Sequence, residues 1–221
     1  MNNLKILYED NHIIVVVKPV NILSQKDSTN DIDMLTIIKD YIKKKYDKKG
    51  NVYLGLVHRL DRPVGGVMVF AKSSKAASRL TKMIKEHDFS KKYLAVINGK
   101  INKKEGELED YLLKKEDGNT IVTDKNHGKI SKLKYKVVEE CDNYSLVDIE
   151  LLTGRHHQIR VQFASRGYPL YGDQRYGKCD NKQIALWAYS LEFVHPVKKE
   201  MMRFSSFPPK KDGWKMFNMK L

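Results

Sequence analysis

Short apolar runs recur along the whole chain, and Asn, Asp, Gly or Pro residues separate most of them. Runs of this length and spacing are typical of β-strands, and closely spaced neighbours predict hairpins. The segments that predict strands are 4–9, 12–18, 52–57, 67–71, 92–97, 133–139, 144–151, 184–193 and 201–207.

A helical period replaces the strand pattern in three places. From Asp33 onward, Leu35, Ile38 and Ile42 fall on one face, with lysines opposite. Ser73 or Ser74 is placed to cap a second helix. The predicted helices are residues 33–50, 73–87 and 157–165.

The mixture of strands and helices favours the α+β class, built on one mixed sheet with flanking helices. A polar stretch, residues 103–126, predicts a hairpin or loop over the surface. The 221 residues suffice for one sizeable domain, and neither a linker nor a repeat divides them. We therefore expect a single domain over residues 1–221.

Targeting and redox signals are weak. The longest aliphatic run, Ile13 to Val17, is too short to cross a bilayer, and the N-terminus carries no signal-peptide pattern. Cys141 and Cys179 form no CxxC pair and have no metal-ligand spacing. These features predict a cytoplasmic protein with free thiols.

Charge changes the picture of possible partners. The formal net charge is +14, from 41 Lys and Arg against 27 Asp and Glu. Such an excess favours a polyanionic partner. A coat of solvated lysine is the alternative, and composition alone does not choose between them. The basic residues gather at 39–49, 72–92 and 198–220.

One bend between two apolar runs carries the strongest chemical signal. Asp61 lies there beside Pro63 and two glycines, where a carboxylate held at the floor of a pocket can act as nucleophile or base. A guanidinium within a few ångströms would keep it ionised. Arg155, presented by a loop at Gly154, is the candidate partner. The alternative is that Asp61 only caps its turn.

Other side chains add to this candidate site. Arg59 points the same way as Asp61 on an extended backbone, where it can reach into a nucleic-acid stack, contact phosphate or pair with Asp61 itself. Tyr93 offers a ring for stacking and a hydroxyl for proton transfer. His156 and His157 lack a third metal ligand at helical spacing, which favours packing or hydrogen bonding. Neither GxxxxGK[ST] nor GxGxxG occurs, so a nucleotide cofactor is not expected.

Several motifs in register resemble the RluA-type pseudouridine synthases, and the similarity spans almost the whole chain. In chain order they are Tyr8 to His12, Val17 to Pro19, His58 to Asp61 with Gly66 and Lys72, Lys92 to Ala95, Leu152 to Arg155 and His157 to Arg160. The match continues through Gly167 to Pro169, Gly172 with Asp173, His195 with Pro196, and Pro208 with Pro209.

The resemblance implies a mixed, largely antiparallel sheet with a central active-site cleft. It implies that the protein isomerises uridines in rRNA or tRNA to pseudouridine, as a monomer without metal or cofactor. Asp61 would be the catalytic aspartate, Arg155 its ion-pair partner and Tyr93 the residue against the uracil. The substrate-binding residues would be Arg59, His58, Arg160, Lys72 and Lys92.

The chain departs from the family pattern at three points. Val64 and Gly65 replace a common Thr-Ser pair, and His156 stands where a threonine is common. A separate N-terminal RNA-binding module is not expected, so the catalytic domain's own basic surface would recognise RNA. A catalytically inactive RNA-binding protein is the runner-up, but it would tolerate loss of Asp61 or Arg155. A kinase-like loop is rejected because Gly66 stands where an asparagine is needed.

Overall fold

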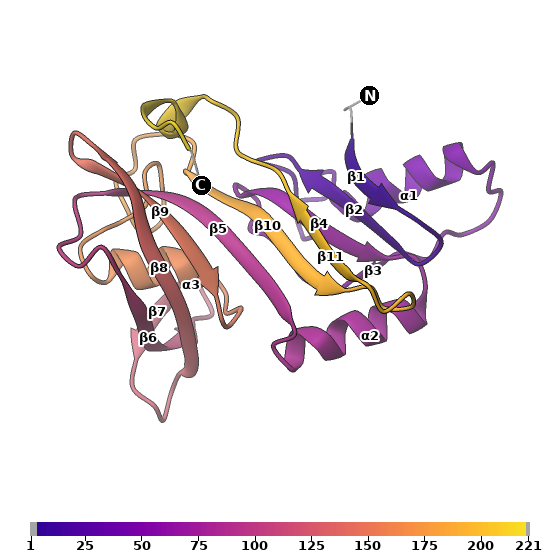
Figure 1. The fold of residues 1–221 in the computed structure, drawn as a ribbon, viewed down its shortest axis with the longest axis horizontal. Helices are drawn as coiled ribbons and strands as arrows, with labels where there is room; N and C mark the ends of the chain where they lie inside the picture. Colours follow the sequence, from indigo (N-terminus) through magenta and orange to yellow (C-terminus); the bar gives the residue numbers. More distant parts are fainter. Residues whose placement is uncertain (1–3, 220–221) are drawn as a thin grey trace. The chain divides into compact units, whose positions relative to one another are not determined.

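The computed structural model describes residues 4–219. The chain forms two compact units. The first unit runs to Ser90 and includes Ala188–Phe207, and the remaining residues form the second. The chain passes between the units within strands β5 (Phe89–Asn98) and β10 (Leu186–Val194), as can be followed in Figure 1, and again after Phe207.

The sheet of the first unit follows the order β1-β2-β4-β10, while β3 pairs with β4 and β11 pairs with β10. Every residue of β2 and β4 is buried, which explains why these runs are apolar without alternation. Stacked Phe89 and Phe193 rings, 5.1 Å apart, belong to the core. The strands are β1 (Lys5–Glu9), β2 (Ile13–Lys18), β3 (Gly55–Leu56), β4 (Gly65–Ala71) and β11 (Met201–Ser205).

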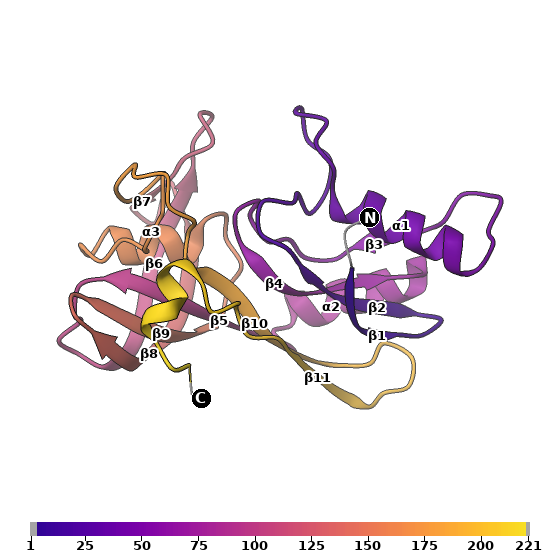
Figure 2. The same ribbon diagram turned by 90° about the horizontal axis from the view of Figure 1, so that it is seen from above.

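Two capped helices complete the first unit. The Asp33 carboxylate accepts hydrogen bonds from two backbone N–H groups at the start of α1 (Met34–Lys45), which lies beside β1 and β2 in Figure 2. Ser73 caps α2 (Ser74–Lys85) by accepting a hydrogen bond from the backbone N–H of Ala76. Helix α1 ends before the expected Gly50, because Asp47 takes a left-handed φ of 45°.

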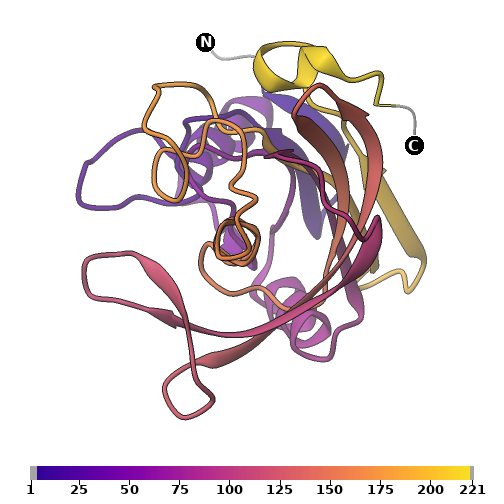
Figure 3. The same ribbon diagram turned by 90° about the vertical axis from the view of Figure 1, so that its left-hand side faces the viewer.

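The second unit has the strand order β5-β9-β8-β6-β7, and all its strand pairs are antiparallel. Figure 3 shows these strands curving around α3 (Gln158–Ala164). Phe163 of α3 contacts the ring of Tyr135 edge to face, at 5.8 Å between centroids. The strands are β6 (Glu105–Lys114), β7 (Thr120–Thr123), β8 (Lys129–Cys141) and β9 (Tyr144–Leu151), and a 3-10 turn, η1 (Asp212–Met216), follows near the C-terminus.

These elements confirm the predicted α+β class and its largely antiparallel strands. The polar stretch 103–126 forms the β6–β7 hairpin, as expected. The strand predicted over 52–57 was wrong for most of its length, since only Gly55 and Leu56 pair with β4. None of the helices within residues 4–219 has the length and apolar character needed to span a membrane.

Candidate active site

The Asp61 loop, residues 57–64, joins β3 to β4 in the first unit. Leu60 and Val64 are buried, and the carboxylate-bearing Asp61 between them is half-buried. The turn closes where Val64 N donates to Asp61 O at 3.0 Å. Gly66 follows with a φ of 130°, and a Cβ there would lie 2.2 Å from the Ala188 carbonyl oxygen. The loop is therefore built on an anchored turn and a position that needs glycine.

A buried lysine anchors this loop through a hydrogen bond to its backbone. Lys18, the last residue of β2, is completely buried. Its Nζ donates to the backbone oxygens of Pro19 (3.0 Å), Ile22 (2.6 Å) and Arg62 (3.0 Å). Burial lowers the pKa of Lys18 to about 7, while the negative charge of Asp61 acts to raise it. Lys18 thus ties the residue after Asp61 to the end of β2.

Ser24 fixes the residue before Asp61. Its buried Oγ donates to Leu60 O at 2.8 Å and accepts from Leu60 N at 3.1 Å. Sequence analysis missed Ser24 and used Lys18 only as part of a motif. A signal for Lys18 was available, because a lysine that closes a wholly apolar strand requires buried partners. Ser24 lies in a polar stretch and gave no such signal.

The neighbours of Asp61 have different environments. Arg59 is exposed, and Arg62 pairs with Asp31 at 2.7 Å in a partly exposed ion pair. His58 Nε2 accepts a hydrogen bond from Val69 N at 3.1 Å, so the ring also fastens the loop to β4.

Lys72 directly follows β4, and its ammonium contacts Glu9 at 2.7 Å. Lys45 contacts the same carboxylate at 2.7 Å. Burial alone would raise the pKa of Glu9, but hydrogen bonds from Lys45, Lys72, Tyr41 and Tyr46 hold it at about 2. The charge of Lys72 is therefore balanced within the protein.

In the second unit, Gln158 organises the loop that carries Arg155. Its Oε1 accepts from Thr153 Oγ1 at 2.8 Å and from Arg155 N at 3.0 Å, and its Nε2 donates to Lys132 O. The exposed Arg155 guanidinium donates from Nε to Ile130 O at 3.0 Å. The buried amide of Gln158 thus sets the backbone position of Arg155.

The two adjacent histidines are stacked, with ring centroids 3.7 Å apart. Nδ1 of His156 lies 2.8 Å from Thr120 Oγ1, and Nδ1 of His157 lies 2.7 Å from the Tyr176 hydroxyl. These contacts confirm the predicted packing and hydrogen-bonding role. His156, a departure from the family pattern, connects β7 to the Arg155 loop.

Arg160 is buried and forms a bidentate ion pair with Asp173, with both N–O distances at 2.8 Å. Burial acts to raise the pKa of Asp173, but the Arg160 guanidinium and two backbone N–H groups hold it below its ordinary value. Within the second unit this pair ties α3 to the following loop.

Tyr93 is buried on β5, opposite Ile149 of β9. Lys92 pairs in register with Glu150. Lys91, which sequence analysis did not single out, lies so close to Gly154 that a Cβ there would be 3.4 Å from its Nζ. Burial lowers the pKa of Lys91. Its Nζ is therefore a further basic group beside the Arg155 loop.

The predicted site residues fall into two groups. Those of the first unit are Asp61, Arg59, His58 and Lys72, and those of the second are Arg155, Tyr93, Arg160 and Lys92. Within each unit the contacts above hold the loops in place. The ion pair between Asp61 and Arg155 stays a prediction.

Comparison with known proteins defines the class. A family model described as RNA pseudouridylate synthase matches residues 12–165. An uncharacterized RNA pseudouridine synthase of Bacillus subtilis is 33% identical over 90% of this chain and 67% of its own length. Ribosomal large subunit pseudouridine synthase C of Escherichia coli strain K12 is 32% identical over 98% of this chain and 69% of its own length. Ribosomal large subunit pseudouridine synthase D of Borreliella burgdorferi is 30% identical over 92% and 65%.

Solved structures agree on the fold. Human RNA pseudouridylate synthase domain containing 4 matches with a TM-score of 0.79 and 20% identity, covering 93% of this chain and 89% of that one. Human RNA pseudouridylate synthase domain containing 1 gives 0.75 and 22%, covering 94% and 84%.

The class is therefore that of RNA pseudouridine synthases, which are isomerases. The chain belongs to the RNA pseudouridylate synthase family, and its relatives confirm the predicted RluA-type resemblance. It spans about two thirds of the length of these relatives.

Proposed function

We propose that the protein converts uridines in ribosomal RNA to pseudouridine, with Asp61 as the catalytic carboxylate. The reaction breaks the N1–C1′ bond of the nucleotide and forms a C1′–C5 bond; the C5 hydrogen leaves as a proton, and N1 takes up a proton. The observation that carries the proposal is the anchoring of the Asp61 loop on both sides, by Ser24 at Leu60 and by Lys18 at Arg62. A catalytic group needs such a fixed position, whereas a surface turn does not.

The second unit supplies the other proposed roles. Arg155 would keep the Asp61 carboxylate ionised, and Tyr93 would lie against the uracil. Arg59, exposed beside Asp61, would enter the RNA stack in place of the target nucleotide. His58, Lys72, Arg160 and Lys92 would contribute to substrate binding.

The names of the relatives support ribosomal RNA as the substrate, because they include ribosomal large subunit pseudouridine synthases C and D. The net charge of +14 supports RNA as the partner in general. We place the enzyme in the cytoplasm and expect it to act as a monomer, without a protein partner or cofactor.

The test uses transcripts labelled with tritium at C5 of uridine. The wild-type protein should release tritium from a large-subunit ribosomal transcript and not from a pool of transfer RNA transcripts. Carbodiimide mapping of the product should then locate pseudouridine at defined positions. Release from transfer RNA alone would overturn the ribosomal assignment, and release from neither would overturn the proposed substrate class.

A further inference from the structure

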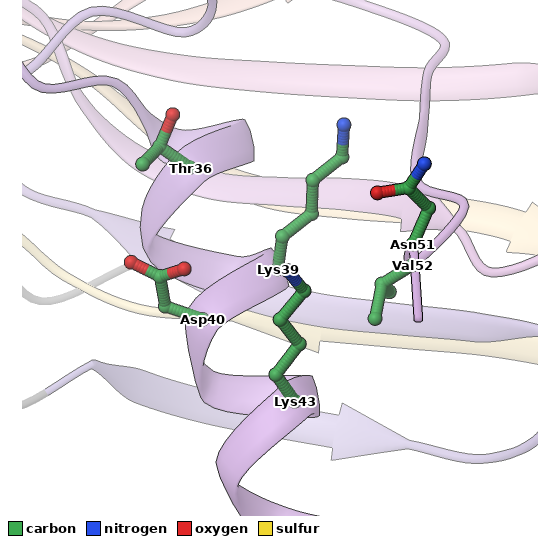
Figure 4. Close-up of a pocket in the computed structure, with 6 residues that line it drawn as sticks. All are labelled: Thr36, Lys39, Asp40, Lys43, Asn51 and Val52. Atoms are coloured by element: carbon green, nitrogen blue, oxygen red, sulfur yellow. The ribbon is translucent and has the colours of Figure 1, made fainter. Parts of the chain in front are cut away.

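A groove outside the Asp61 loop lies between helix α1 and the segment at Asn51. Its volume is about 430 Å³. Figure 4 shows Lys39 extending along the groove toward Asn51, with Lys43 one turn further along the helix. The lining residues are Thr36, Lys39, Asp40, Lys43, Asn51 and Val52.

The two groove lysines differ from two other lysines of the first unit, Lys45 and Lys72. Lys45 and Lys72 are paired with Glu9. Among the described residues, neither Lys39 nor Lys43 has a carboxylate oxygen within 4.0 Å of its ammonium. Asp40 is also on α1, but in Figure 4 its carboxylate points away from both ammonium groups. The groove therefore presents two positive charges that the protein does not neutralise.

In the sheet of the second unit, by contrast, two lysines lie opposite acidic residues of neighbouring strands. Lys134 lies between Glu107 of β6 and Glu150 of β9 in the strand register. Lys136 lies in the same manner between Glu105 and Asp148. Cross-strand opposition of this kind balances charge locally. Lys134 and Lys136 therefore lie among acidic residues, which makes them a reference for the two groove lysines.

Helix stability accounts for only part of the α1 charge. Lys43 lies in the last turn, where a cation is favoured by the helix dipole. Lys39 lies mid-helix, where that effect has faded. Two ammonium groups one turn apart and an amide at Asn51 instead match the oxygens of a phosphodiester.

We propose that the α1 groove binds the phosphate backbone of the RNA that carries the target uridine. Lys39 and Lys43 contact phosphate oxygens, and Asn51 donates a further hydrogen bond. The proposal rests on RNA as the substrate, but not on which RNA is modified. The α1 groove would account for part of the RNA recognition that we expect from the basic surface.

The test compares wild-type protein with a double variant, Lys39→Gln with Lys43→Gln. Binding to a fluorescein-labelled RNA duplex is measured by anisotropy over a series of salt concentrations. Loss of two phosphate contacts should reduce the salt slope of log K by roughly 1.8, at about 0.9 per contact, and weaken binding at least about tenfold near 0.1 M salt. The maximal tritium-release rate should stay unchanged while KM rises.

The matched control is Lys134→Gln with Lys136→Gln, which removes the same net charge from the balanced sheet. Its binding should remain close to that of the wild type. Lys39→Arg with Lys43→Arg should retain binding, because the charges remain. An unchanged salt slope in the groove variant, or an equal loss in the control, would overturn the proposal. If the protein failed to modify ribosomal RNA, the proposed substrate would be overturned. The duplex titration would still test whether the α1 groove binds RNA.

Discussion

The hydroxyl of Ser24 bonds both backbone groups of Leu60, donating to its oxygen at 2.8 Å and accepting from its nitrogen at 3.1 Å. This reciprocal contact spans 36 positions of sequence. Since Leu60 immediately precedes Asp61, a side chain from a distant polar segment fixes the backbone that carries the proposed catalytic carboxylate.

Replacement of this hydroxyl should affect turnover more than binding. Ser24→Ala leaves the buried N–H of Leu60 without its acceptor, which costs about 1–3 kcal/mol of folding free energy. Displacement of Asp61 should lower kcat by roughly tenfold to a hundredfold with little change in KM. Steady-state tritium release and denaturant unfolding measure the two effects.

Ser73→Ala is the matched control for this prediction. Ser73 caps α2 through the N–H of Ala76, and loss of a cap costs about 1 kcal/mol. We expect a comparable loss of stability with unchanged kcat. If both variants lowered kcat equally, Ser24 would have only a general structural role.

The Glu9 cluster predicts a specific acid response. The pKa of Glu9 is about 2 in the folded protein, against 4.5 for an ordinary glutamate, so its contribution to stability is present above pH 4.5 and is lost as pH falls toward 2. This contribution amounts to about 3 kcal/mol, since one pKa unit corresponds to about 1.4 kcal/mol. Glu9→Gln should therefore lower stability at neutral pH, and the gap to wild type should close between pH 4.5 and 2.

Urea unfolding across that pH range, in wild type and variant, checks the response. Asp10 also titrates near pH 2, but it is present in both proteins and cancels in the comparison. A stability gap that stayed constant with pH would show that Glu9 acts through packing rather than charge.

The buried pair of Arg160 and Asp173 should contribute to the free energy of unfolding, and not only to RNA affinity. Asp173→Asn leaves the Arg160 guanidinium without its counter-ion, and breaking a buried pair in this way costs about 3–5 kcal/mol. Arg166→Lys, at a more exposed pair with Asp110, should cost less than about 1 kcal/mol. Equal unfolding midpoints for Asp173→Asn and wild type would contradict the prediction.

Local patterns predicted the parts of the fold that depend on local physics. The stripe of Leu35, Ile38 and Ile42, and the serine before α2, located two helices correctly because periodicity and capping act within a few residues. The strand over 52–57 was overestimated, since Val52 and Leu54 are buried without pairing. Pairing depends on β4, which the run itself does not reveal.

The candidate site was predictable to a similar extent. Pro and Gly signals marked the Asp61 bend, and the bend is an anchored loop. Its supports, Ser24 and Lys18, act across long sequence separations, so no local pattern could identify their partners. The hydrogen bond between His156 and Thr120 also joins residues far apart in the sequence, so no local pattern could predict it.

The central claim is that the Asp61 carboxylate performs the chemistry. The most direct measurement compares tritium release by Asp61→Asn and by Asp31→Asn, which alters an exposed aspartate of the same unit that pairs with Arg62. The account predicts that Asp61→Asn binds RNA as the wild type does and releases no tritium above the protein-free background, while Asp31→Asn remains active. Sustained release by Asp61→Asn would contradict it.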